Sequence, residues 1–336
     1  MDRPKVTVHP GPENYDLLIL QQQHRFQAVW DEKLTGQNAC LTIRRANHEF
    51  WNQVRQYPLH NRILNYFERC GFGGVLAVGN VQYDEGIITA LIERWRPETH
   101  TFHMLTGECV ITLHDVERNV KKITKSTWRE LTYDLTGWLP GEEAIIGNSL
   151  LVITQLSNHL ETLIVKNDII DEHTDETEVQ KRVRLYLLWL IGGTIFPDNT
   201  GSKLSLHFLL DIIDLDAIGG KAWGATTLSY LYNCLCCASM ANNGDICGFI
   251  ALLQVWAWER IIPMQPLLRP PRVNERDIVF AQKWTRRGVR ESETRVVLVV
   301  CRDVLDNLTD DQFVWDPYTE AINDGLPEWC RRGQDI

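Results

Sequence analysis

The densest group of titratable side chains lies between residues 98 and 115. It comprises three histidines and three carboxylates: His100, His103, His114, Glu98, Glu108 and Asp115. Such groups can exchange protons with a substrate, so they could supply a general acid and base. No nucleophile or orienting partner stands at a recognisable spacing, and residues three apart in a strand point to opposite faces, so His100 and His103 cannot share a metal within one strand. A structural polar cluster is the favoured interpretation, and catalysis stays open as the alternative.

Thiols and an imidazole, the ligands that zinc prefers, form a second group. It consists of Cys234, Cys236, Cys237, Cys247 and His207. The first three cysteines fall in a helical segment, where positions i, i+2 and i+3 spread over too wide an arc to meet on one ion. Small apolar thiols suit the buried face of a helix, so we expect core packing here and predict neither a metal nor a cofactor.

Glycines near residue 71 resemble part of a dinucleotide-binding loop. Gly71, Gly73 and Gly74 follow a helical pattern, however, where that loop needs a strand, and their spacing differs from the fingerprint. We therefore expect a helix end followed by a turn. The sequence also lacks a phosphate loop and the nucleophile elbow of hydrolases, which excludes two common routes to enzyme chemistry.

A basic stretch with an interleaved tryptophan runs from Lys283 to Arg295. Such a pattern can contact nucleic acid or an acidic partner, but exposed charge runs are usually solvated, so a solvated loop is favoured over direct DNA binding. Trp256 and Trp258 lie about 200° apart on a helix. We expect one of them in the core and the other against a neighbouring helix or a partner.

Hydrophobic periodicity predicts a mainly helical chain that forms a single large domain. After a first apolar stretch at 17–30, helices are expected at about residues 61–70, 84–95, 149–165, 177–196, 204–213, 223–240, 247–262 and 295–307. Thr177 and Gln180 form a capping-box pattern at the start of the stripe that Pro197 ends.

Two short alternating runs around Gly107 predict a β-hairpin at about residues 99–112. Thr112 and Asp115 then form a helix-start pattern, and a short extended segment is expected at 312–315. The charged stretches 116–130 and 167–178 are interpreted as exposed connectors.

These patterns divide the chain into a flexible tail at 1–16, a folded domain at 17–318 and a polar tail at 319–336. Within the folded domain we expect an N-terminal lobe at about 17–166, an acidic connector at 167–176 and a C-terminal helical lobe at 177–318.

Composition narrows the class of protein. The 336 residues carry 34 Lys and Arg against 44 Asp and Glu, a formal charge of −10, so contact with nucleic acid is expected to be indirect or weak. The first twenty residues lack the features of a signal peptide and no stretch approaches a spanning length, which predicts a soluble intracellular protein without membrane contact. Nine cysteines, mostly in apolar segments, suit reduced thiols, and we expect no disulfide.

The segment 90–103, ALIERWRPETHTFH, is followed by Gly107-Glu108 and by TLHDV at 112–116, and together they closely resemble the signature of the plant mobile domain, also labelled aminotransferase-like. Segments at 186–188, 196–198, 223–224, 253–260, 302–306 and 315–318 are similar to that family in the same order. The resemblance covers about residues 59–318. Its candidates for structural roles or partner contact are Glu93, Arg94, Trp95, Arg96, Pro97, Glu98, Thr99, His100, Phe102, His103, Gly107, Glu108, Asp115, Trp256, Trp258, Glu259 and Arg260.

The resemblance implies a nuclear, MAIN-like interaction module of transposon-related origin. It implies roles in meristem maintenance, transposon silencing and gene expression, together with a phosphatase-seven-like or chromatin-associated partner. The metal-ligand motifs of such phosphatases are missing, and neither Lys203 nor Lys221 has the setting of a cofactor lysine, so no catalytic residues carry over. The alternatives are a hydrolase or transposase-related enzyme that uses residues 98–115, or a decayed copy without function.

One segment departs from the family pattern. The family continues after T-L-x-D-V with a Leu-rich helix and a Gly-Leu-Pro-Val-Asp-Gly-like loop, whereas Glu117 to Lys125 stands here. Similarity resumes at Trp128. The shortened segment at 117–127 predicts either locally rearranged packing or reduced function.

Overall fold

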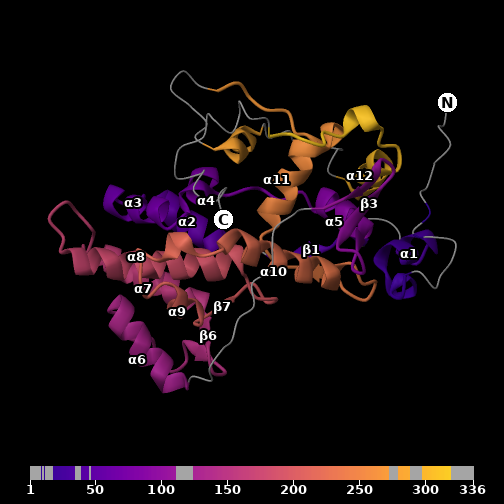
Figure 1. Cartoon of the computed structure of the whole chain (residues 1–336). Coiled ribbons are helices and arrows are strands. Elements are labelled where there is room, and N and C mark those ends of the chain that lie inside the picture. Colours follow the sequence, from indigo (N-terminus) through magenta and orange to yellow (C-terminus); the bar gives the residue numbers. More distant parts are fainter. Residues whose placement is uncertain are drawn as a thin grey trace. The chain divides into compact units, whose positions relative to one another are not determined.

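The computed structural model (Figure 1) describes residues 9, 11, 18–34, 39–44, 47–110, 124–271, 279–287 and 297–318. Contacts group the chain into two compact units: unit 1 is built from 1–44, 81–114 and 224–325, and unit 2 from 45–80, 115–223 and 326–336. This grouping differs from the expected consecutive lobes at 17–166 and 177–318. The chain passes between the units near residues 44, 80, 114 and 223, and the acidic segment 167–176 lies inside unit 2.

Unit 1 combines helices with two small sheets. Its helices are α1 (Arg25–Trp30), α5 (Glu85–Arg94), α10 (Trp223–Ala238), α11 (Ile250–Arg260) and α12 (Leu298–Asp306), with 3₁₀ turns η1 (Gln21–Gln23), η5 (Ile262–Met264), η6 (Phe280–Arg286) and η8 (Asp310–Gln312). Strands β2 (Trp95–Arg96), β3 (Thr101–Met104) and β4 (Gly107–Cys109) form an antiparallel sheet in that order. Strands β1 (Thr42–Ile43) and β8 (Asp245–Ile246) pair in parallel.

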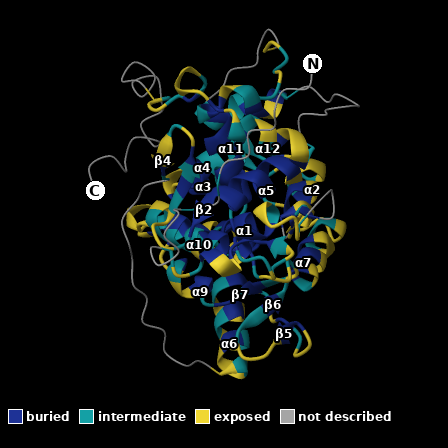
Figure 2. Cartoon of the chain, turned by 90° about the vertical axis from the view of Figure 1, so that its right-hand side faces the viewer, coloured by how far each residue is buried: buried dark blue, intermediate teal, exposed yellow. Residues whose placement is uncertain are grey.

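The core of unit 1 is centred on α5. Every residue from Gly86 to Arg94 is buried, and the helix packs against α11 and α12. Figure 2 shows α5 and α11 largely in dark blue, the colour of buried residues. Because α5 is enclosed on all sides, the charged residues at its C-terminal end lie inside the protein and need partners there.

Unit 2 is built mainly from helices. They are α2 (His48–Gln56), α3 (Asn61–Arg69), α4 (Gly73–Val78), α6 (Lys125–Thr136), α7 (Ile153–Val165), α8 (Glu176–Leu190) and α9 (Phe208–Asp211), with a π-helical turn η3 (Ile191–Ile195) and a 3₁₀ turn η4 (Ile218–Gly220). Strands β5 (Ile145–Ile146), β6 (Leu150–Val152) and β7 (Lys203–Ser205) form an antiparallel sheet in that order.

Helix α8 is the central element of unit 2. The Asp175 side chain accepts a hydrogen bond from the Thr177 backbone N–H and so caps the helix, which packs against α3, α6, α7 and α9. The helix continues into η3, where Gly192 faces β7. A Cβ atom at Gly192 would lie 2.6 Å from the Cβ of Leu204, so glycine is what lets helix and strand approach each other here.

The predicted fold class is confirmed: the chain is mainly helical and carries a small hairpin, β3–β4, where one was expected. Helices α3, α5, α10 and α11 lie within a few residues of their predicted positions. In the expected C-terminal extended segment, Phe313 forms an antiparallel bridge with Ile261. Among the helices in the described ranges, none combines the length and the apolar character needed to cross a membrane.

Several local predictions are wrong. Residues 150–152 form β6 because they pair with β7, so the expected helix at 149–165 begins only at Ile153. The expected helix at 204–213 is divided between β7 and the short α9. Gly73 begins α4 where a turn was expected. Lys125 to Glu130 belong to α6 and not to a connector, since Trp128 is completely buried.

Two further differences concern helix ends and an additional helix. Asp175 caps α8 in place of the predicted Thr177. Helix α2 has no counterpart among the sequence predictions. The helix start expected at Thr112 and Asp115 lies outside the described residues, as do residues 117–123 of the shortened segment and most of both tails.

Candidate functional site

The signature begins with four consecutive buried residues at the junction of α5 and β2. Glu93, Arg94, Trp95 and Arg96 are each at most 3% exposed. The Glu93 carboxylate accepts hydrogen bonds from Arg302 of α12, from Nε at 2.8 Å and from Nη2 at 2.7 Å. Arg25 Nε lies 3.7 Å from the same carboxylate. Glu93 therefore balances two cations inside unit 1.

Arg94 belongs to the same buried set of charges. Its guanidinium pairs with Asp306 of α12 and lies over the ring of Phe26, 4.5 Å from the ring centre. Burial lowers the pKa of Arg94 to about 10, while Glu93 acts in the opposite direction. The side chain therefore stays charged at neutral pH, and its role is to join α5 to α12 and α1.

Trp95 is a core residue. Its ring meets Phe102 edge-on at 4.9 Å and tilts against Tyr232 at 5.0 Å, and its Nε1–H donates to Cys236 Sγ at 3.3 Å. Phe102 in turn stacks on Trp256 at 5.0 Å. These contacts fix β2 and β3 against α10 and α11.

Residues 97–100, which include Pro97, Glu98 and Thr99, make the turn between β2 and β3. Glu98 accepts a hydrogen bond from the Leu20 backbone N–H at 2.9 Å, and Thr99 and Thr101 share a hydrogen bond between their hydroxyls at 2.7 Å. His100 adopts a positive φ of 54° and stacks its ring on Tyr232 at 5.7 Å. The turn is therefore held by its own side chains.

His103 stands apart from His100. It lies opposite Glu108 in the β3–β4 register, on the face of the hairpin away from the buried Phe102 and Met104. Burial and the neighbouring cations Arg96 and Arg94 lower the pKa of His103, so its imidazole is neutral at physiological pH. The two histidines thus face different environments, and His114 and Asp115 lie outside the described residues.

Arg96, at the end of β2, is also buried. Burial lowers its pKa, and Glu98 and Glu108 act against that shift. Its guanidinium lies 5.8 Å from the centre of the Phe26 ring, and its Nη2 has no hydrogen-bond partner in the part of the chain that the structure describes.

Helix α11 carries the second part of the signature. Trp256 and Trp258 are both buried, and Trp258 packs against the neighbouring helical turn η6, one of the two environments expected for the second tryptophan. Trp256 stacks on Phe102, and Trp258 lies 5.5 Å from Trp284, between ring centres. Helix α11 is enclosed, and this leaves no tryptophan face for a partner.

Part of the basic stretch that begins at Lys283 forms hydrogen bonds and ion pairs within unit 1. Glu259 accepts hydrogen bonds from Trp284 Nε1 at 2.6 Å and from Lys283 Nζ at 2.8 Å. Arg287 donates to Asp84 Oδ2 at 2.7 Å. These internal pairs differ from the solvated loop that was expected, and residues 288–296 lie outside the described ranges.

Of the four cysteines expected in the core, two are buried and Cys236 is half-buried. Cys234 and Cys247 are buried, with 3.5 Å between their sulfur atoms, whereas Cys237 is exposed. His207 packs against Trp128 in unit 2. Among the described residues, no three or more metal-ligating side chains converge on a common point.

Three separate parts of the signature meet at one surface of unit 1, which we call the hairpin–aromatic surface. It is formed by Leu105, Gly107, Arg260, Trp315 and Tyr318. The Trp315 ring comes within 3.8 Å of a Cβ built on Gly107, and Arg260 lies over the Tyr318 ring at 5.6 Å. Val314 N–H donates to the Arg260 carbonyl at 2.8 Å, which holds this segment against the end of α11. Trp315 nevertheless remains 52% exposed.

The sequence-based candidates include Gly107 and Arg260 of this surface but omit Leu105, Trp315 and Tyr318. The similarity of segment 315–318 to the family, with its tryptophan and tyrosine, was the available signal. The approach of residue 315 to residue 107 depends on tertiary contacts and cannot be predicted from local patterns.

Comparison with known proteins places these features in a family. The plant mobile domain model matches residues 71–336. The chain is 31% identical to an Arabidopsis thaliana protein named serine/threonine-protein phosphatase 7 long form homolog, over 97% of this chain and 25% of that protein. It is 31% identical to MAIN-LIKE 2 (95% and 47%) and 30% identical to MAINTENANCE OF MERISTEMS (93% and 63%), both from the same plant. The chain thus spans less than two thirds of each of these relatives, and no solved structure matches it. The chain belongs to the plant mobile domain family.

Proposed function

We propose that this chain is a non-enzymatic protein-interaction module that acts in the nucleus. It works in meristem maintenance, transposon silencing and gene-expression control, together with a phosphatase-seven-like or chromatin-associated partner. Family membership supports this proposal, as do relatives whose names refer to meristem maintenance and to a phosphatase 7 long form.

The exposed Trp315 is the observation that carries the proposal. The buried signature residues Glu93, Arg94 and Glu259 are engaged in ion pairs within unit 1, so they hold the fold together. The hairpin–aromatic surface instead presents a large ring to solvent beside Tyr318 and Arg260. Trp, Tyr and Arg are the residues that dominate the binding energy of protein interfaces.

The test is affinity purification of the tagged chain from plant nuclei, followed by mass spectrometry. Trp315→Ser should lose the proteins that the natural chain enriches, because a central aromatic anchor contributes about 2 kcal/mol or more to binding. Trp30→Ser is the matched control, since Trp30 is a 41%-exposed tryptophan on α1 of the same unit. Equal recovery with all three chains, or no enriched protein at all, would contradict the proposal.

An enzymatic role for residues 98–115 predicts a different result. Turnover by the purified chain that is lost in a folded His103→Ala variant would replace the interaction proposal with a catalytic one. His103 is half-buried on the hairpin, so the substitution leaves the core contacts of Phe102 and Met104 in place.

A further inference from the structure

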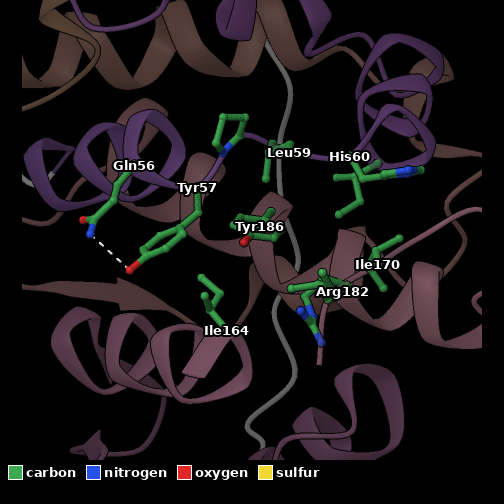
Figure 3. Close-up of a pocket in the computed structure, with 11 residues that line it drawn as sticks. Gln56, Tyr57, Leu59, His60, Ile164, Ile170, Arg182 and Tyr186 are labelled. Atoms are coloured by element: carbon green, nitrogen blue, oxygen red, sulfur yellow. Dashed lines mark hydrogen bonds between the residues drawn. The ribbon is translucent and has the colours of Figure 1, made fainter. Parts of the chain in front are cut away.

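A pocket in unit 2 is lined by apolar side chains from three separate parts of that unit. It has a volume of about 320 Å³. Its walls come from the loop between α2 and α3, from the end of α7 with the acidic loop after it, and from α8. Figure 3 shows Tyr57, Leu59, Ile164, Ile170 and Tyr186 around the cavity. Of the family-like segments, only 186–188 contributes to it, through Tyr186, and it is separate from the hairpin–aromatic surface of unit 1.

The acidic loop, residues 166–175, is held in a fixed conformation. Arg62 Nη1 donates to the carbonyl of Asp171 at 3.0 Å, and Arg182 Nη1 donates to the carbonyl of Asp168 at 3.2 Å. Inside the loop, the Asp171 carboxylate accepts hydrogen bonds from the His173 backbone N–H at 2.9 Å and from the Thr174 hydroxyl at 2.8 Å. The pocket wall is therefore preformed, which reduces the entropy cost of binding.

The pocket lining is mainly apolar and includes the cation Arg182, and the adjoining segment after α7 adds negative charge. Ile169, which lines the pocket, is 56% exposed, and the nearby Val165 is 84% exposed. Segment 166–178 carries six carboxylates and a single lysine, a net charge of −5. Including the pairing cations Arg62, Lys181 and Arg182, six acids still face four cations, a net charge of −2. This sign disfavours nucleic acid and favours a basic ligand.

We infer that this pocket binds a short peptide segment of a partner protein that carries apolar residues flanked by Lys or Arg. The volume lies at the lower end of the roughly 300–1,000 Å³ typical of ligand sites, which suits one or two apolar side chains. Apolar anchors would enter between Tyr57, Ile164 and Ile170, and basic residues would lie along the acidic loop. The inference rests on the proposed interaction function, but it uses a surface of unit 2.

The experiment uses the purified full chain and a phage-displayed library of random peptides of about 12 residues, long enough for the anchor spacings of helical and extended ligands. The expected result is enrichment of peptides that combine apolar residues two to four positions apart with Lys or Arg. Synthetic peptides of the enriched sequence should then bind with an affinity that falls as salt rises.

Substitutions in the chain test whether a selected peptide binds in this pocket. Ile169→Ser and Tyr57→Ala should each weaken a selected peptide by about tenfold or more, and Glu172→Lys should weaken it and reduce its salt dependence. Leu139→Ser, at a 53%-exposed leucine of unit 2 that does not line the pocket, should bind like the natural chain. Thermal melts verify that each variant is folded.

Three outcomes would overturn the inference: no enriched sequence, enriched sequences without basic residues, or binding that survives both Ile169→Ser and Tyr57→Ala in folded protein. Failure here is distinguishable from failure of the proposed function, because recovery of nuclear partners that depends on Trp315 tests unit 1 and does not use the peptide library.

Discussion

Glu93 is the residue whose environment most sharply separates a structural role from a catalytic one. Its carboxylate receives two hydrogen bonds from Arg302 and faces Arg25, and it is 2% exposed. A buried carboxylate between two guanidinium groups is fully committed to charge balance and has no access to a substrate. The same reasoning applies to Arg94 with Asp306.

Glu93→Gln should therefore destabilise the protein by about 3 to 5 kcal/mol, because it leaves buried guanidinium groups without their counter-charge. Urea unfolding measures the effect. Glu130→Gln on the exposed face of α6 is the control and should change the free energy of unfolding by about 0.5 kcal/mol or less. A near-neutral Glu93→Gln would mean that the ion pairs contribute little.

A second single residue, His24, makes a pH-dependent contribution to the stability of the folded protein. Its Nδ1 accepts a hydrogen bond from the Phe26 backbone N–H and its Nε2–H donates to the Trp95 carbonyl, a pattern that requires the neutral ring. Burial, with help from Arg96, lowers the pKa of His24 to about 4 from an ordinary value of 6.5. The unfolded chain therefore binds the proton more readily than the folded one between these two pH values.

The resulting stability is fully present above pH 6.5 and is lost as the pH falls towards 4, by an amount on the order of 3 kcal/mol. Comparison with His24→Asn isolates this contribution, because Asn can still cap α1 while it does not titrate. His159, whose pKa burial also lowers to about 4, contributes with the same sign in both proteins. If the free energy of unfolding changed with pH equally in the natural chain and in His24→Asn, the contribution assigned to His24 would be contradicted.

At the scale of elements, the close packing of η3 against β7 depends on a glycine, Gly192, which has no side chain. Gly192→Ala would place a methyl group 2.6 Å from Leu204 Cβ, an atom that cannot move without its strand. We expect a loss of about 1 to 3 kcal/mol in the free energy of unfolding. Gly220→Ala is the matched control, since its added Cβ meets nothing within 4 Å, and it should be close to neutral. Equal effects of the two substitutions would show that packing of η3 on β7 is not the cause.

Elements whose apolar pattern is strong could be predicted from the sequence, and those decided by distant partners could not. The apolar residues of α5 recur at helical spacing and lie in the core of unit 1, so this helix could be predicted. In contrast, Leu150 to Val152 fit a helix equally well, and they form a strand through pairing with β5 and with β7, the latter some fifty residues later in the sequence. Helix α6 was not predicted, because it begins in a basic segment and a single residue, Trp128, provides much of the buried surface of the helix.

The candidate site shows the same division between local and distant information. The signature residues could be recognised by resemblance, but their roles depend on partners more than two hundred residues away, such as Arg302 for Glu93. The pocket of unit 2 joins the loops after α2 and α7 to α8, so periodicity alone could not reveal it. The pair Ile169-Ile170 within an acidic run was the one local signal, since a purely solvated connector has no need of adjacent isoleucines.

At the scale of the whole molecule, the chain consists of two compact units whose segments alternate along the sequence. Its charge of −10 favours protein partners over nucleic acid, in line with the interaction module proposed above. Unit 1 presents the hairpin–aromatic surface, and unit 2 presents the apolar pocket beside the acidic loop. An interaction module acts through the proteins that it binds, so its central measurable property is its binding affinity for a partner protein.

The most direct measurement of that property is the dissociation constant between the purified chain and a phosphatase-seven-like protein, obtained by titration calorimetry. The account predicts measurable binding by the natural chain and by Trp30→Ser, and at least about tenfold weaker binding by Trp315→Ser, which corresponds to a loss of about 1.4 kcal/mol or more. Equal binding by all three folded proteins, or none by the natural chain to this protein or to any partner recovered from nuclei, would contradict it.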